Sequence, residues 1–389
     1  MFEIQKEKLN QAEQYLDEYN VDVWLIVAKG GDDPCLPLIL EVKAGGVFAI
    51  LLTRSGKRVL LCNKEDAYSF EETDLFEVKI TNNLNECLQT EISKLNPTTI
   101  ALNVSKEEHL VDGLTAGRFR WLIRTLKNDF KGEYVSSERI LTKLRTIKSS
   151  NEIARIQKAI TVTEEIYQAV FSELKAGMTE KEIGQLFVRE MEMREVVNGI
   201  DRTLSMPIVM KENIAHRAPS EATVHPGDLV IMDFSVDVEG YVSDIARTVY
   251  FLKEDEDRAP HKIEQAFLAV HEAISRAASI IVPGVMGYMV DEAARNYFVS
   301  NGYPEITHAT GHQIGRAVHD GGGLFAPRWK RYGNSPFVEI EEGMVFTIEP
   351  TLFLDDGIHF IVEENIVVTS TGIQYLTKRQ NELILIPAN

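Results

Sequence analysis

Two acidic residues, Asp233 and Asp244, lie in consecutive apolar stretches that have the pattern of neighbouring β-strands. Asp233 interrupts the run Leu229-Val-Ile-Met-Asp-Phe, where a carboxylate buried without a partner would be strongly destabilising. The turn residues Val238-Glu239-Gly240 predict a hairpin tip between the two acids. Such a hairpin places Asp244 opposite or diagonal to Asp233 on one face.

A second hairpin, predicted over residues 344–369, repeats this arrangement. Glu349 and Glu363 are symmetric about Asp356, the centre of an Asp-Asp-Gly turn. If the two hairpins pack face to face, four carboxylates converge, and their repulsion in a poorly hydrated site requires cations. Two divalent metal ions would supply the four positive charges.

A histidine between glycines, His312 in the segment Gly311-His-Gln-Ile-Gly315, could add one imidazole to these oxygen ligands. A carboxylate-rich set with one imidazole suits Mn²⁺, Fe²⁺, Co²⁺ or Zn²⁺ better than an ion that prefers thiolates. Three further histidines, His216, His308 and His319, are distributed so that they could surround the site.

Each of these residues, taken singly, has a simpler interpretation. Asp233 and Asp244 are more often strand-edge or turn carboxylates, and a single histidine is more often a hydrogen-bonded core or surface residue. The complete set consists of two symmetric carboxylate hairpins and a glycine-flanked histidine. It makes a dinuclear metal site as well supported as these simpler interpretations.

The elements that position these residues form two predicted domains, 1–147 and 148–389. Ser149 and Glu152 have the spacing of a capping box and open the second domain, in which the order helix, helix, strand, strand occurs twice. The first domain alternates helical stretches with strands near residues 23–28, 47–53, 58–62 and 99–103, which predicts a mixed α/β sheet. We find no chemistry there, and expect His109, Asp32 and Asp33 to be solvated.

The composition narrows the class of protein. The 389 residues carry a formal net charge of −18, which disfavours nucleic acid and anionic membrane surfaces as partners. Three cysteines without metal-type spacing indicate a reducing compartment, and the charged start of the chain does not resemble a signal peptide. We therefore expect a cytoplasmic α/β protein without membrane spans.

Six motifs surround the candidate ligands: Ile231-Met-Asp233-Phe, Ser243-Asp244-Ile-Ala-Arg247-Thr248, His308-Ala-Thr-Gly-His312-Gln-Ile-Gly315, Val318-His319-Asp320, Phe346-Thr-Ile-Glu349-Pro350 and Val362-Glu363-Glu-Asn-Ile-Val-Val-Thr369. Together they resemble those of the M24-type pita-bread metallopeptidases, the family of methionine aminopeptidase, aminopeptidase P, prolidase and creatinase. The resemblance covers residues 150–389, and residues 1–147 resemble, less specifically, a creatinase-type N-terminal domain.

The resemblance implies a pita-bread catalytic domain and a role for each matched residue. His216 and His319 would face the substrate and assist proton transfer, His308 would be a secondary pocket residue, and Glu349 would also shuttle a proton. Asp244 and Glu363 would bridge two metal ions, with manganese first and cobalt, zinc or iron as alternatives. The full set of metal ligands would be Asp233, Asp244, His312, Glu349 and Glu363.

The implied activity is hydrolysis of short peptides of the Xaa-Pro type, and we expect a homodimer. Three departures bear on the substrate: Ile361 stands where an arginine is usual, Glu364-Asn365 replaces the expected Asp-Asp, and a long loop follows His319. Arg328 or Arg331 of that loop could supply the missing cation. The alternatives are a small-molecule amidase or lyase on the same metal frame, and a binding module without turnover.

Overall fold

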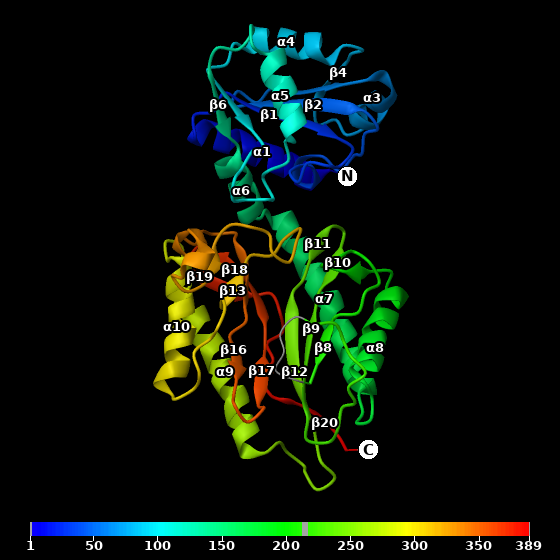
Figure 1. Ribbon diagram of the computed structural model, residues 1–389, viewed down its shortest axis with the longest axis vertical. Coiled ribbons are helices and arrows are strands. Elements are labelled where there is room, and N and C mark those ends of the chain that lie inside the picture. Colours follow the sequence, from blue (N-terminus) through cyan, green and yellow to red (C-terminus); the bar gives the residue numbers. More distant parts are fainter. Residues whose placement is uncertain (1, 212–216, 389) are drawn as a thin grey trace. The chain divides into compact units, whose positions relative to one another are not determined.

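The computed structural model describes residues 2–211 and 217–388, and the chain divides into two compact units, Met1–Arg145 and Thr146–Asn389 (Figure 1). The first unit is built around one six-stranded mixed sheet with the strand order β4-β3-β2-β1-β5-β6. Its strands are β1 (Val23–Lys29), β2 (Val47–Thr53), β3 (Arg58–Cys62), β4 (Glu77–Ile80), β5 (Thr99–Leu102) and β6 (Glu133–Ser136).

Helices cover both faces of this sheet. Because side chains alternate along a strand, Trp24 and Ile26 of β1 pack with Leu9 of the first helix, whereas Leu25 packs on the other face with Leu88. Burial on both faces explains the nearly continuous apolar runs of β1 and β2. The helices are α1 (Glu3–Glu18), α2 (Leu36–Ile39), α3 (Lys64–Glu71), α4 (Leu84–Leu95), α5 (Ala116–Thr125) and α6 (Glu138–Thr146).

Two helix pairs frame the second unit, α7 (Ser150–Glu173) with α8 (Glu180–Met193), and α9 (His261–Ser279) with α10 (Gly287–Ser300). Capping boxes open α7 at Ser149 and α8 at Thr179, because each N-cap hydroxyl and the glutamate three residues later satisfy each other's backbone amides. In Figure 1 the two pairs lie on opposite sides of the strands of this unit. No helix in the described part of the chain is long and apolar enough to cross a membrane.

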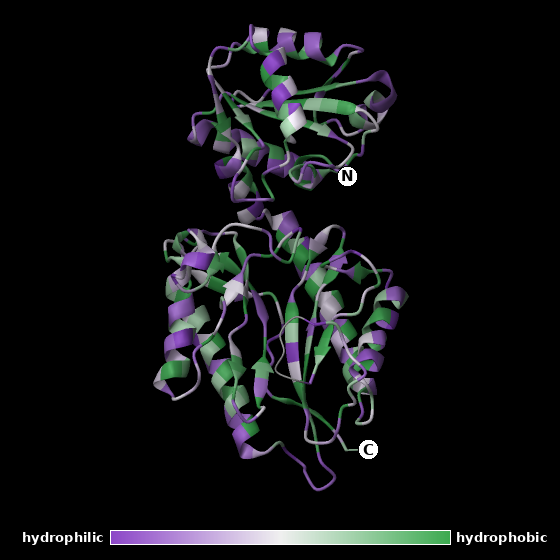
Figure 2. Cartoon of the chain, in the orientation of Figure 1, coloured by the Kyte–Doolittle hydropathy of each residue, from purple (hydrophilic) through white to green (hydrophobic). Residues whose placement is uncertain are grey.

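The strands of the second unit form several small sheets, of which the largest has the order β20-β12-β9-β8. Figure 2 shows that these strands are mainly hydrophobic, while the helices carry hydrophilic residues along their length. The strands are β7 (Val197–Asn198), β8 (Ile208–Met210), β9 (Leu229–Phe234), β10 (Val236–Val238), β11 (Tyr241–Val242), β12 (Ile245–Phe251), β13 (Gly311–His312), β14 (Leu324–Phe325), β15 (Val345–Ile348), β16 (Thr351–Phe353), β17 (His359–Ile361), β18 (Glu364–Thr369), β19 (Gly372–Tyr375) and β20 (Ile384–Ile386), with 3₁₀ turns η1 (Lys330–Tyr332) and η2 (Ser335–Phe337).

Both predicted hairpins are present. In the first, β9 pairs with β12 and β10 with β11 in one register, and the turn lies at Glu239 and Gly240, which both have positive φ. In the second, β15 pairs with β18 and β16 with β17, around a turn that contains Gly357 at φ 89°. The predicted repeat of two helices followed by two strand pairs is therefore confirmed.

Candidate metal centre

The first hairpin delivers two carboxylates to one face of the second unit. Asp233 on β9 pairs with Ala246 on β12, so Asp244, two residues before Ala246, lies diagonally across from it. Burial and the nearby charge of Glu349 raise the pKa of Asp233 to about 7. Burial and the charge of Asp233 raise the pKa of Asp244 well above its usual range. The charge of Asp233 thus disfavours the ionised form of Asp244.

The second hairpin delivers Glu349 and Glu363 from a gap between its two pairings. The pairs Ile348–Glu364 and Thr351–Ile361 belong to one continuous register, which places Glu349 opposite Glu363. Burial, followed by the charges of Asp244 and Glu349, raises the pKa of Glu363 well above its usual range.

The two hairpins lie side by side, joined by backbone contacts between β12 and the Glu363 segment. The Glu363 amide donates to the Ala246 carbonyl at 3.1 Å, and Thr248 Oγ exchanges hydrogen bonds with the backbone of Ile361. These contacts fix the spacing between the carboxylates of the two hairpins.

His312, on the short strand β13, joins the carboxylates. Its Nε2 lies 3.2 Å from Glu349 Oε1 and 3.6 Å from Asp244 Oδ2. Burial alone would lower the pKa of His312, but the adjacent Glu349 and Asp244 carboxylates raise it to about 9. In turn, burial would raise the pKa of Glu349, and the bond from His312 outweighs it and lowers that pKa.

The donor set fits a divalent metal centre. Ligand atoms of Asp244, His312 and Glu363 all lie within 4.8 Å of one another. Glu363 Oε1 is buried and has no hydrogen-bond partner among the described residues. An unpaired buried carboxylate oxygen is strongly disfavoured unless a cation binds it, so these residues have the chemistry of a metal site.

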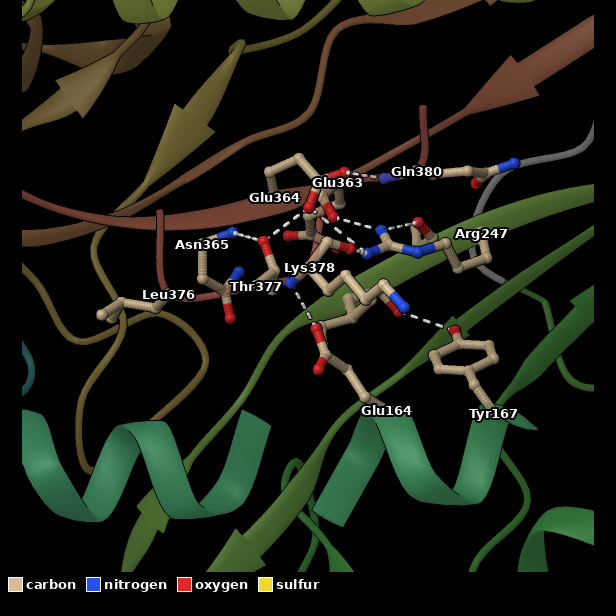
Figure 3. Close-up of polar contacts among 12 residues, drawn as sticks. Glu164, Tyr167, Arg247, Glu363, Glu364, Asn365, Leu376, Thr377, Lys378 and Gln380 are labelled. Atoms are coloured by element: carbon tan, nitrogen blue, oxygen red, sulfur yellow. Dashed lines mark hydrogen bonds and ion pairs between the residues drawn. The ribbon is translucent and has the colours of Figure 1, made fainter. Parts of the chain in front are cut away.

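A buried polar network supports the two central carboxylates from behind (Figure 3). Arg247 on β12 donates to the Glu363 carbonyl at 2.6 Å and to the Glu364 carboxylate at 3.3 Å. Asn365 uses its side-chain amide to bind both the amide and the carbonyl of Asp244. Residues 376–380 close the network, since Thr377 and Gln380 donate to Glu364. The network therefore fixes the backbones of Asp244 and Glu363, which belong to different hairpins.

The predicted histidines have different positions. The ring of His319, an exposed residue, lies 4.3 Å from that of His312, centroid to centroid, and His319 lowers the pKa of Glu349 behind the larger effect of His312. His308 is half-buried, and its Nε2 lies 2.7 Å from Thr351 Oγ1. His216 lies outside the described residues.

The residues that departed from the family pattern also have defined places. Ile361 is half-buried on β17. Arg328 pairs with Glu292 of α10 at 2.8 Å and lies over the ring of Tyr288, so its charge is already matched. Arg331 donates to the carbonyl of Thr307, next to His308, and stacks on Trp329. Arg331 therefore lies near the predicted pocket residue His308, whereas Arg328 is paired with Glu292.

One expectation about the first unit was wrong. Asp33, expected to be solvated, is 1% exposed and accepts hydrogen bonds at 2.9 Å from Asn103 Nδ2 on both carboxylate oxygens. Asn103 belongs to the Asn-Val-Ser triplet after β5, and no local sequence signal relates it to Asp33. The contact joins residues 70 positions apart, which only the folded sheet brings together.

Comparison with known proteins places the second unit in a family. Residues 154–370 match metallopeptidase family M24. An Xaa-Pro dipeptidase of Pyrococcus horikoshii is 29% identical over 256 residues, which cover 65% of this chain and 68% of that protein. An uncharacterized peptidase of Staphylococcus aureus is 28% identical over 349 residues, which cover 85% and 88%.

Solved structures extend the likeness to the fold of both units. An Xaa-Pro dipeptidase from Bacillus anthracis has a TM-score of 0.76 at 23% identity, and the match covers 98% of this chain and 99% of that one. An X-Pro aminopeptidase from Thermotoga maritima has a TM-score of 0.74 at 24% identity, covering 97% and 99%. These similarities confirm the predicted α/β class with a pita-bread second unit.

Proposed function

The chain belongs to metallopeptidase family M24, and we propose that it hydrolyses short peptides with two divalent metal ions held by its carboxylate hairpins and His312. The observation that carries this proposal is the convergence of Asp244, His312 and Glu363, with one Glu363 oxygen buried and unpaired among the described residues. In the proposed site Asp244 and Glu363 would hold both ions, as the family resemblance implies. Asp233 and Glu349 complete the carboxylate ligands.

The ligand types favour some metal ions over others. Four carboxylates and one imidazole are hard or borderline donors, which favour manganese and also accept cobalt, zinc or iron. When bound, such ions polarise a peptide carbonyl and make a water molecule nucleophilic at neutral pH.

The remaining chemistry belongs to side chains around the metal ligands. Glu349 is the residue we assign to proton transfer, because its carboxylate lies 3.2 Å from His312 Nε2, beside the other proposed ligands, and accepts a proton when ionised. The exposed His319, whose ring centroid lies 4.3 Å from that of His312, is the residue we assign to stabilise the oxyanion or protonate the leaving amine. We assign the same role to His216 from its sequence position alone.

We propose that the substrate has proline after the scissile bond. The names of the Pyrococcus dipeptidase and the Thermotoga aminopeptidase support this class. The side chain of Ile361 cannot replace the guanidinium of the arginine that is usual at this position in aminopeptidase P and prolidase. Arg331, which contacts the Thr307 carbonyl beside His308, is our candidate for the compensating cation, whereas Arg328 is engaged by Glu292.

A peptide panel tests this proposal. Xaa-Pro-Xaa, Xaa-Pro and Xaa-Ala-Xaa peptides are compared with Mn²⁺ and Co²⁺ for wild type, Arg331→Ala and the matched variant Arg328→Ala. We expect Xaa-Pro cleavage, with KM raised about tenfold by Arg331→Ala, the effect of one lost charge-assisted contact, and little changed by Arg328→Ala. If Arg331→Ala cleaves Xaa-Pro peptides as well as wild type does, Arg331 does not supply the missing cation, and the proposed peptidase activity still stands.

The same panel separates the alternative functions. If metal-loaded wild type cleaves no peptide but turns over small amides, the small-molecule amidase takes the place of the peptidase. If it turns over neither and still binds peptides, the chain is a binding module.

A further inference from the structure

A buried ion pair lies next to the proposed substrate-facing histidine. Lys148 Nζ is 3.1 Å from Asp320 Oδ2, and the two side chains are 1% and 2% exposed. Asp320 directly follows His319 in the chain. Both partners belong to the second unit, although 172 positions separate them.

Lys148 is held in place by its own backbone. Its amide donates to the Gly343 carbonyl at 3.0 Å, and the next residue, Ser149, is the N-cap of α7. The lysine thus reaches the loop after His312 from a fixed point beside the longest helix of the unit.

The loop itself, residues 313–320, is closed on Asp320. The Asp320 amide donates to the Gln313 carbonyl at 2.9 Å, so the loop begins after His312 and returns beside it at His319. This closure brings the two imidazole rings to a centroid distance of 4.3 Å.

Packing around the ion pair leaves no room for a side chain at Gly315. A Cβ added there would lie 2.2 Å from Asp320 Oδ2 and 2.7 Å from Lys148 Cε, both well inside contact distance. The Gly315 carbonyl also accepts from the Val242 amide at 2.9 Å, which ties this half of the loop to β11. Gly315 therefore packs directly against the Lys148–Asp320 ion pair.

We propose that Lys148 is a positioning residue that acts through Asp320 to hold His319 over His312. The inference rests on the proposed function, since it concerns a histidine assigned there to proton transfer or oxyanion binding. Loss of the Lys148 charge would destabilise the buried Asp320 carboxylate, and we expect a shift of residue 320 that displaces the adjoining His319. A displacement of about 1 Å in a catalytic group can lower the rate by about 10²-fold.

The kinetic test compares Lys148→Met and Asp320→Asn with Arg189→Met, which removes the ion pairs of Arg189 on α8 with the exposed Glu173 of α7 and with Glu190. We expect kcat and kcat/KM to fall together by about 10 to 10²-fold in the first two variants and to stay unchanged in the third. Thermal melting confirms that each variant is folded.

A double-mutant cycle distinguishes positioning from general damage. Because Lys148 acts through His319, Lys148→Met is expected to cause no further loss of kcat in a His319→Ala background. An equal loss in both backgrounds overturns the proposal.

Amide exchange supplies a readout that does not depend on activity. In metal-free protein, exchange of residues 313–320 is expected to accelerate at least tenfold in Lys148→Met and Asp320→Asn, and not in Arg189→Met. Unchanged exchange would show that the Lys148–Asp320 ion pair does not stabilise residues 313–320. Absence of peptide cleavage by metal-loaded wild type would instead refute the proposed function. The exchange rates would still show whether the ion pair stabilises residues 313–320.

Discussion

Glu91 of the first unit and the proposed metal ligands of the second unit are buried acids with opposite surroundings. Glu91 in the first unit has a side chain only 2% exposed, yet three lysines neutralise it, with Lys79 Nζ at 2.7 Å, Lys94 Nζ at 3.1 Å and Lys57 Nζ at 3.5 Å. Burial raises the pKa of Glu91, but the bonds from Lys79 and Lys94 outweigh it and lower the pKa to about 2.

In the second unit the buried acids of the proposed metal site face one another instead. Burial and the charges of neighbouring carboxylates raise the pKa of Asp244 and Glu363 well above the usual range. Asp244 forms an ion pair with His312 at 3.6 Å. Arg247 lies behind the site, where it binds the Glu363 carbonyl and the Glu364 carboxylate.

This difference distinguishes structural acids from candidate ligands. A carboxylate whose two oxygens are both paired with lysines contributes to the fold and has no need of a metal ion. Carboxylates that converge with too few donors destabilise the metal-free protein, and this deficit is what bound cations would remove.

The largest expected effect lies at the edge of the ligand cluster. His319→Ala, like His216→Ala, should retain metal and lower kcat by about 10² to 10⁴-fold, the range for a lost acid–base or oxyanion group. Steady-state kinetics together with metal analysis checks this. Loss of metal from either otherwise folded variant would show that the histidine is a ligand and that the cluster extends further than proposed.

The next effect concerns the paired acid of the first unit. Glu91→Gln should lower the free energy of unfolding by about 2 kcal/mol at pH 7, less than the full linkage value because the three lysines reach solvent. Since the folded pKa is depressed, this stability is present above pH ~5 and lost as pH falls toward about 2.

Urea unfolding of the full chain between pH 2 and pH 7 measures this contribution. A Trp329→Phe background leaves Trp24 and Trp121 as reporters of the first unit. Equal stability of wild type and Glu91→Gln at pH 7 would mean that Glu91 is not a stabilising acid, and the contrast between the units would fail.

The smallest effect has the opposite sign. In excess chelator, Glu363→Gln should raise the free energy of unfolding of the metal-free protein by about 1 kcal/mol, because it removes one of the mutually repelling carboxylates. With metal present the same change should be destabilising. Thermal melts with and without metal measure both signs, and destabilisation under both conditions would place Glu363 with the structural acids.

Much of the second unit could be predicted from local patterns. The turn residues of each hairpin define a register, and that register alone places Asp244 diagonal to Asp233 and Glu349 opposite Glu363. The capping box at Ser149 likewise has a purely local signal. Strands β4 and β6 were missed because their short sequences, Glu-Val-Lys-Ile and Glu-Tyr-Val-Ser, carry little apolar surface.

The contacts that complete the site depend on the folded chain. Lys148 with Asp320, and Arg247 with Glu364, join residues more than 100 positions apart, and only the folded second unit brings them together. The roles of the ligands, the homodimer and the cytoplasmic location stay predictions.

Metal content tests the central claim most directly. Wild type, Asp244→Ala, Glu363→Ala and the control Glu91→Gln are dialysed against Mn²⁺ and analysed for bound metal per chain. We predict two ions in wild type and in Glu91→Gln, and none in either hairpin variant, because each removes a proposed bridge between the ions. Two ions retained by both Asp244→Ala and Glu363→Ala would contradict the dinuclear site.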